Sequence, residues 1–245
     1  MEERTNKYQL LKTIIKNSKS IVVFTGAGIS VPSGIPDFRS STGIYSQKTK
    51  QGYSPEEVIS HSFFMRNPED FFEFYKDKMC FPLAKPNAAH EYFAKIEKQG
   101  KNVTVVTQNI DGLHQLAGST RVYELHGSIH RNYCMSCNAS YTLDQVLKKK
   151  GVPYCDKCGD IIKPDVVLYE EPLDDITINY ALSAIMTADV MIVIGTSLRV
   201  YPAASFVRYF KGKYLILINK DKTDYDENCD LVFNEDVINV IKQIQ

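Results

Sequence analysis

Three features that would narrow the function at once are missing from this sequence. The 245 residues carry 29 lysines and arginines against 29 aspartates and glutamates, so the formal net charge is zero. A neutral chain has no bulk electrostatic signature of nucleic-acid binding. The longest unbroken apolar runs, such as 190–194, have five residues, whereas a membrane-spanning helix needs about 20. The sequence therefore predicts neither a direct nucleic-acid partner nor a membrane partner.

The sequence also begins without a secretory signal. Residues 1–5 lead into a mixed polar stretch that lacks the apolar core of a signal peptide. We therefore expect a cytoplasmic protein, in which thiols stay reduced. The isolated residues Cys80 and Cys229 are expected to be buried or incidental thiols. The oligomeric state does not follow from the sequence, and a monomer is expected.

What the sequence does contain is an ordinary globular composition, 44% hydrophobic and 24% charged. The length predicts one large domain, with or without a small satellite. Short apolar runs, at 21–24, 103–107, 122–125, 166–168, 190–194 and 214–218, alternate with segments of helical spacing at 8–17, 87–99, 175–187, from about 202 and from about 236. This alternation predicts an α/β fold, a Rossmann-like parallel sheet with helices on both faces.

Two segments interrupt the alternation. Residues 44–83 are rich in aromatic side chains and predict a helical insertion, and residues 131–163 contain paired cysteines and few aliphatic residues. We expect the two insertions to form one small domain. The remaining segments, 1–43, 84–130 and 164–245, would form the large domain.

The paired cysteines predict a metal site. Cys134 pairs with Cys137 and Cys155 with Cys158, and seventeen residues separate the pairs. Two such turns can direct four sulfurs at one ion, with the spacing of a zinc ribbon. Disulfides are disfavoured in a reducing compartment, and a redox Cys-x-x-Cys motif would need only one pair. We expect one structural zinc ion, whose four cysteine ligands leave no open coordination position. The ion would hold together a segment too poor in apolar residues to fold alone.

The first predicted strand runs into a glycine loop that contains Gly26, Ala27 and Gly28. Such a loop lets backbone N–H groups approach a pyrophosphate closely. A dehydrogenase fingerprint would need glycine where Val31 stands, and an acidic residue within the stretch 46–50, which has none. The loop therefore favours nucleotide binding without hydride transfer.

The turn that follows carries three side chains suited to a nucleotide. Arg39 can bind a phosphate through two parallel hydrogen bonds, and Phe38 can shield a reacting sugar from water. Asp37 precedes them. An ordinary turn is the alternative at this point.

Polar residues follow several of the predicted strands. In open parallel sheets, ligands bind beyond the carboxyl ends of the strands. The residues in question are Gln108, Asn109 and Asp111 after the first of these strands, His126 after the second, Gly195, Thr196 and Ser197 after the third, and Asn219 and Lys220 after the fourth. Several polar strand ends on one edge favour a ligand site more than any one of them would.

His126 is the candidate general base, because an imidazole titrates near the working pH. A structural histidine is the alternative, just as residues 109–112 alone could be only a turn. Weaker claims belong to His61, His90, His114 and His130.

Taken together, these segments resemble the sirtuin family of NAD-dependent protein-lysine deacylases. The matching blocks are the four cysteines and residues 26–30, 34–39, 107–114, 125–127, 163–167 and 195–198, in the family's order. The resemblance points to a compact bacterial member. It implies that the large domain binds NAD and that the acyl group of a protein lysine passes to ADP-ribose, with release of nicotinamide and deacylated lysine.

The resemblance also implies a role for individual residues. His126 would be the general base, with Asn109 as a second catalytic residue, and Asn109, Asp111 and Ile35 would line the nicotinamide pocket. The residues expected to bind NAD are Gly26, Ala27, Gly28, Ile35, Asp37, Phe38, Arg39, Gln108, Asn109, Ile110, Asp111, His126, Gly195, Thr196, Ser197, Asn219, Lys220 and Val237.

On the substrate side, the resemblance implies that Val167 and Tyr169 line the tunnel for the acyl-lysine. The substrate peptide would add as a strand between the segments after 166 and after 198. Two residues depart from the family pattern. Val31 stands where threonine is common in bacterial members, and Glu170 stands where glycine is usual. Because of Glu170, the sequence does not predict the backbone geometry at the peptide groove.

The acyl preference depends on the helical insertion. Members that prefer succinyl-lysine carry Tyr-x-x-Arg there, whereas this chain has Tyr75 and Lys78 at those positions. Lys78 could hold a carboxylate as a point charge, without the two-pronged geometry of arginine. We expect acetyl-lysine to be preferred and leave longer or acidic acyl groups open. The alternative is that Tyr75 belongs to the core and Lys78 to the surface.

Two other functions remain open at this point. Protein mono-ADP-ribosyl transfer would use the same NAD site with a different acceptor. A zinc-ribbon binding module for protein or nucleic acid would be no enzyme at all, but the few basic residues of 131–163 give it little electrostatic support.

Overall fold

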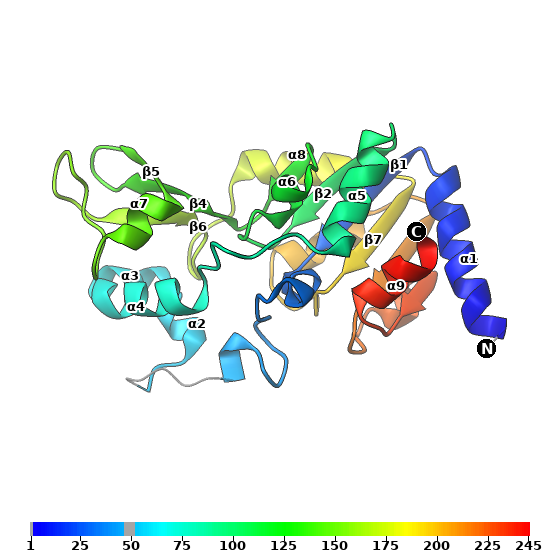
Figure 1. Ribbon diagram of the computed structural model, residues 1–245, viewed down its shortest axis with the longest axis horizontal. Helices are drawn as coiled ribbons and strands as arrows, with labels where there is room; N and C mark the ends of the chain where they lie inside the picture. Colours follow the sequence, from blue (N-terminus) through cyan, green and yellow to red (C-terminus); the bar gives the residue numbers. More distant parts are fainter. Residues whose placement is uncertain (1, 47–51) are drawn as a thin grey trace.

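The computed structural model describes residues 2–46 and 52–245, which form two parts side by side (Figure 1). The larger part is a six-stranded sheet with the strand order β3-β2-β1-β7-β8-β9. Its neighbouring strands are all parallel, which confirms the predicted α/β class. The strands are β1 (Ser20–Thr25), β2 (Asn102–Thr107), β3 (Val122–Glu124), β7 (Val190–Ile194), β8 (Tyr214–Ile218) and β9 (Leu231–Phe233).

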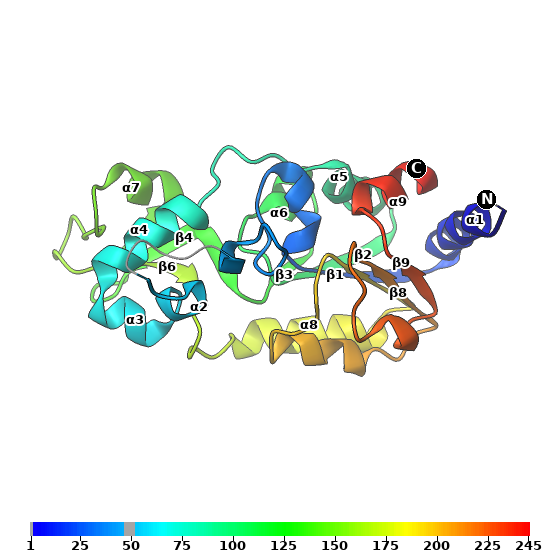
Figure 2. The ribbon, with the colours of Figure 1, turned by 90° about the horizontal axis from the view of Figure 1, so that it is seen from below.

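Helices cover both faces of this sheet (Figure 2). On one face lie α1 (Glu2–Asn17), α5 (Ala88–Lys98) and α9 (Val237–Ile244), with the short α6 (Leu113–Ala117) packed against α5. On the other lie α8 (Asp175–Thr187) and the 3₁₀ helix Ala203–Tyr209. Successive strand residues point to opposite faces, so Ile21 and Val23 join one core whereas Val22 and Phe24 join the other. Burial on both faces explains why these strands are apolar throughout.

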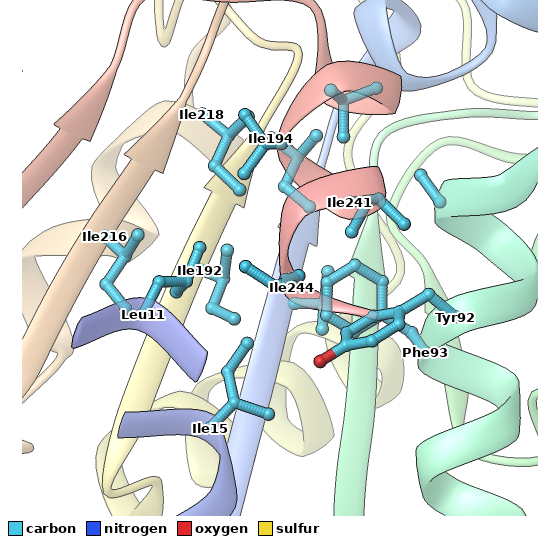
Figure 3. Close-up of a cluster of buried hydrophobic side chains, with 14 of the residues drawn as sticks. Leu11, Ile15, Tyr92, Phe93, Ile192, Ile194, Ile216, Ile218, Ile241 and Ile244 are labelled. Atoms are coloured by element: carbon cyan, nitrogen blue, oxygen red, sulfur yellow. The ribbon is translucent and has the colours of Figure 1, made fainter. Parts of the chain in front are cut away.

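The first core is built mainly from branched aliphatic residues. Figure 3 shows Ile192, Ile194, Ile216 and Ile218 of the sheet facing Ile241 and the other labelled residues of the helices. Since β-branched side chains favour strands, the same residues supply both the strand propensity and the packing surface.

The smaller part joins helices to a second sheet. A three-stranded antiparallel sheet consists of β4 (Gly127–Cys134), β5 (Ser140–Thr142) and β6 (Ile162–Val166), with α7 (Leu143–Lys148) beside it. The helices α2 (Pro55–Val58), α3 (His61–Arg66) and α4 (Pro68–Lys78) pack on it through an aromatic core. This sheet reaches past both ends of the predicted insertion 131–163.

Some elements differ from the sequence predictions. The apolar run 166–168 does not add a strand to the parallel sheet, because Val166 ends β6 and pairs with Gly127 of β4. The helix expected from about 202 is a 3₁₀ helix, and the three-residue β9 was not predicted. Residues 47–50, part of the stretch that offers no acidic residue for a ribose, lie outside the described residues. Among the described helices, none is long and apolar enough to cross a membrane.

The chain passes repeatedly between the two parts. It leaves the six-stranded sheet after β1, returns after α4, leaves again after β3 and returns after β6. The passages at Ile44, Phe81, His126 and Leu168 border a common cavity. Both chain ends lie in the larger part, at the end away from the smaller one (Figure 1).

Candidate active site

A cavity of about 910 Å³ lies where the two parts meet. The carboxyl ends of β1, β2, β7 and β8 open into it, as expected for a parallel sheet. Every residue predicted to bind NAD lines this cavity, and so do Val167, Tyr169 and Lys78. The sheet therefore brings together residues that lie more than 200 positions apart in the chain, from Gly26 to Val237.

The glycine loop is built for close contact with the neighbouring loop after β7. A Cβ atom on Gly28 would lie 2.6 Å from Cα of Gly195, and one on Gly26 would lie 2.7 Å from Cβ of Thr196. Without side chains, the loops pack backbone to backbone, and the N–H of Gly28 donates to the carbonyl of Gly195 at 2.8 Å. At this end of the cavity, the wall therefore consists of backbone atoms of the two loops.

Ser30 connects two polar residues at the end of β2. Its hydroxyl donates to Oδ2 of Asp111 at 2.7 Å and accepts a hydrogen bond from Nδ2 of Asn109 at 3.1 Å. The N–H of Leu113 donates to Oδ1 of Asp111 at 2.9 Å. Burial raises the pKa of Asp111, while these hydrogen bonds favour its charged form. Ser30 was not predicted as a site residue, although it lies in the glycine-loop block.

One ring nitrogen of His126 has a hydrogen-bond partner, and the described residues offer no recorded partner to the other. Nδ1 lies 2.9 Å from the carbonyl oxygen of Gln108. A carbonyl oxygen can only accept, so Nδ1 bears the proton and Nε2 carries the free electron pair. Burial lowers the pKa of His126, which keeps the ring neutral at pH 7. A neutral imidazole with a free Nε2 at the cavity wall can act as a base.

The turn after the glycine loop contributes an aromatic wall. The ring centroids of Phe38 and Tyr45 lie 5.4 Å apart, and the guanidinium of Arg39 lies 5.1 Å from the centre of the Tyr45 ring. Oδ1 of Asp37 accepts hydrogen bonds from the N–H groups of Arg39 and Ser40. Asp37 therefore shapes the turn that presents Phe38 and Arg39.

The segment after β6 forms another part of the cavity wall. The hydroxyls of Tyr169 and Tyr45 lie 2.9 Å apart, and the backbone of Tyr169 bonds to Ile59 and His61 of the smaller part. Glu170 has a φ of +76°, the left-handed region that favours glycine. Its carboxylate accepts hydrogen bonds from the N–H and hydroxyl of Ser62. The side chain thus helps to hold a backbone shape that a glycine would adopt freely.

The structure places the two candidate acyl-selective residues differently. Lys78 lines the cavity, with its amine 3.1 Å from Asp77. Tyr75 has no exposed surface, stacks on Phe71 and is not among the residues that line the cavity. This placement fits the alternative that Tyr75 belongs to the core, and its contact with an acyl group stays a prediction. Tyr75 is buried because it follows Phe71 by one turn of α4 and shares its buried face.

The four paired cysteines come together in the smaller part. Their sulfur atoms all lie within 4.8 Å of one another, with 3.3 Å between Cys134 and Cys158 and 3.6 Å between Cys137 and Cys155. A tetrahedron of Zn–S bonds of about 2.3 Å has edges of about 3.8 Å, so the cluster fits one zinc ion. The hydroxyl of Tyr141 donates to Cys155 Sγ, which lowers the pKa of that thiol to about 6. This favours the thiolate that a zinc ligand must be.

The chain is similar in sequence to proteins of one known family. A model described as the Sir2 family matches residues 26–202. The chain is 58% identical over 240 residues to an NAD-dependent protein deacetylase of Clostridium acetobutylicum, with 98% of each chain covered. It is 46% identical over 239 residues to one of Staphylococcus aureus, again with 98% of each covered.

Solved structures agree over nearly the whole chain. A structure described as a Sir2–p53 peptide–NAD+ complex superposes with a TM-score of 0.86 at 39% identity and covers 97% of each chain. Another, described as Sir2 bound to acetylated peptide, gives a TM-score of 0.85 at 38% identity with the same coverage.

Proposed function

Because this chain belongs to the Sir2 family, as a bacterial member, we propose that it is an NAD-dependent protein-lysine deacetylase. In that reaction the acyl group of lysine passes to ADP-ribose, with release of nicotinamide and deacylated lysine. The observation that carries the proposal is the free Nε2 of His126 in the wall of the cavity where the predicted cofactor and substrate residues meet.

The residues around the cavity fit a dinucleotide. The loops at Gly26 and Gly195 leave no room for a side chain, which suits backbone contact with a pyrophosphate. Asn219, Lys220 and Val237 line the part formed by the ends of β8 and α9, where an adenosine would bind. Asn109, Asp111 and Ile35 would hold the nicotinamide.

His126 would serve as the general base. Its Nε2 would accept a proton from a ribose hydroxyl, while the hydrogen bond from Nδ1 to Gln108 keeps the ring in the required tautomer. Phe38 would exclude water from the reacting sugar. Asn109 would act beside His126 by orienting the groups that react.

The acyl-lysine would enter between the turn at Phe38 and the wall formed by Val167 and Tyr169. Acetyl-lysine is the favoured substrate. Tyr75 is buried and Lys78 lies beside Asp77, so the tyrosine–arginine pair expected for an acidic acyl group has no equivalent here. We further propose that the protein acts in the cytoplasm, where the four zinc-binding thiols would stay reduced.

The experiment is incubation of the zinc-loaded protein with NAD and peptides that carry acetyl-, longer acyl- or succinyl-lysine, read by mass spectrometry. The proposal predicts nicotinamide, acetyl-ADP-ribose and deacetylated peptide in equal amounts. His126→Ala should abolish these products while the melting temperature stays close to that of the wild type. Near-normal turnover in this variant, or transfer of labelled ADP-ribose to protein in place of deacetylation, would refute the proposal.

A further inference from the structure

We propose that an ion pair between the buried Lys163 and the half-buried Glu171 positions the segment 166–168 that lines the cavity and thereby sets the affinity for the substrate peptide. The inference rests on the proposed function, because it assigns a positioning role at that same site. Neither residue contacts the predicted cofactor residues through a hydrogen bond that the described part of the structure records.

The carboxylate of Glu171 bonds the segment from one side. Its Oε2 accepts a hydrogen bond from the N–H of Leu168 at 2.9 Å and from Nζ of Lys163 at 3.1 Å. Its Oε1 lies 2.8 Å from Nδ1 of His61 on α3. These contacts lower the pKa of Glu171 despite its burial, so the charged form is held.

Lys163 bonds the same segment two residues earlier, at Val166. Only 6% of its surface is exposed, and Nζ donates to the carbonyl of Val166 at 3.0 Å as well as to Glu171. The ion pair therefore holds the carbonyl before Val167 and the N–H after it. The N–H of Val167 itself donates to the carbonyl of His126 at 3.0 Å.

These bonds tie the substrate wall to the candidate base. Three consecutive residues, 166–168, each have a backbone group fixed either by the ion pair or by His126. A shift of Val167 would therefore move the peptide wall relative to the imidazole.

A purely stabilising role explains this arrangement less well. A buried ion pair often contributes no more than apolar residues of similar volume, because both charges lose their hydration. Removing one partner is different, since it leaves the other charge buried alone. Removing both charges together should thus preserve the fold and release the segment, which separates positioning from stability.

The experiment compares Lys163→Met/Glu171→Leu and the single variant Glu171→Gln with the wild type. We expect the double variant to melt near the wild type while its KM for the acetyl-lysine peptide rises about tenfold and its KM for NAD stays within about twofold. Glu171→Gln keeps an amide oxygen that can accept from both Leu168 and Lys163, so Lys163 retains hydrogen-bond partners. This variant should show a smaller rise in peptide KM and keeps the test valid if the double variant does not fold.

Asp189→Asn is the matched control. Oδ2 of Asp189 also accepts backbone hydrogen bonds, from Lys19 and Ser20, but at the opposite end of β1 from the cavity. Its peptide KM should equal that of the wild type. An unchanged peptide KM in the folded charge-removal variants, or an equal rise in Asp189→Asn, would overturn the inference. A wild type inactive on every acyl peptide would instead refute the proposed function.

Discussion

Removal of one hydroxyl, in Ser30→Ala, should cost most of the NAD-dependent activity. Ser30 is almost fully buried and joins Asn109 to Asp111. The hydrogen bond to the carboxylate contributes about 1.5–3 kcal/mol and the one from the neutral amide about 0.5–1.5 kcal/mol. The loss is therefore about 2–4.5 kcal/mol. Since about 1.4 kcal/mol corresponds to tenfold, kcat/KM for NAD should fall by at least about 25-fold.

The assay is steady-state deacetylation of an acetyl-lysine peptide at varied NAD. Ser33→Ala is the matched control, because the Ser33 hydroxyl belongs to the same loop but accepts its hydrogen bond from Nδ2 of Asn87. Melting temperatures of both variants separate loss of fold from loss of positioning. If Ser30→Ala retained kcat/KM for NAD within about twofold of Ser33→Ala, the assigned role of the Ser30 network in the nicotinamide pocket would be wrong.

Three further predictions concern the base, the zinc ion and the acyl site. Burial places the pKa of His126 in the folded protein below its ordinary value of 6.5, so the neutral base persists as the pH falls. The acid limb of the kcat/KM profile should therefore have its midpoint below pH 6.5, and a midpoint above it would contradict the assignment. Cys137→Ser, or a strong chelator, should release one zinc ion per chain and unfold the smaller part, seen as a lowered melting temperature and loss of activity, whereas Cys229→Ser should retain the zinc. Tyr75→Phe should leave the ratio of acetyl to succinyl turnover unchanged, since Tyr75 lies in the aromatic core; a change of about tenfold would return it to the acyl site.

The sequence predicted the parallel sheet well because its signals are local. The strands 190–194 and 214–218 are short apolar runs that both faces bury, and the structure begins and ends them at the predicted residues. The three-residue β9 offers too few positions for a period to be recognised. The run 166–168 looked equally strand-like, but which sheet such a run joins depends on its partner, here β4.

The sequence predicted which residues at the strand ends line the candidate site. It did not predict which of these residues bond to one another. Polar residues after buried strands are visible in the sequence, whereas Ser30 and its partner Asp111 are 81 residues apart and meet only in the fold. Lys163 and Glu171 are close in sequence, but only the structure shows that Lys163 is buried, that Glu171 is half-buried and that both bond the segment between them. Tyr75 lies in the aromatic core because its spacing to Phe71 places it on a buried helix face, which the motif position alone does not reveal.

The repeated passage of the chain between the two parts has a mechanical consequence. The passages from one part to the other border the same cavity, at Ile44, Phe81, His126 and Leu168. A rigid-body rotation of one part against the other would therefore widen or narrow that cavity. A ligand bound there contacts both parts, and its binding free energy opposes the unfolding of either one. Occupancy should thus make the unfolding of the two parts more cooperative.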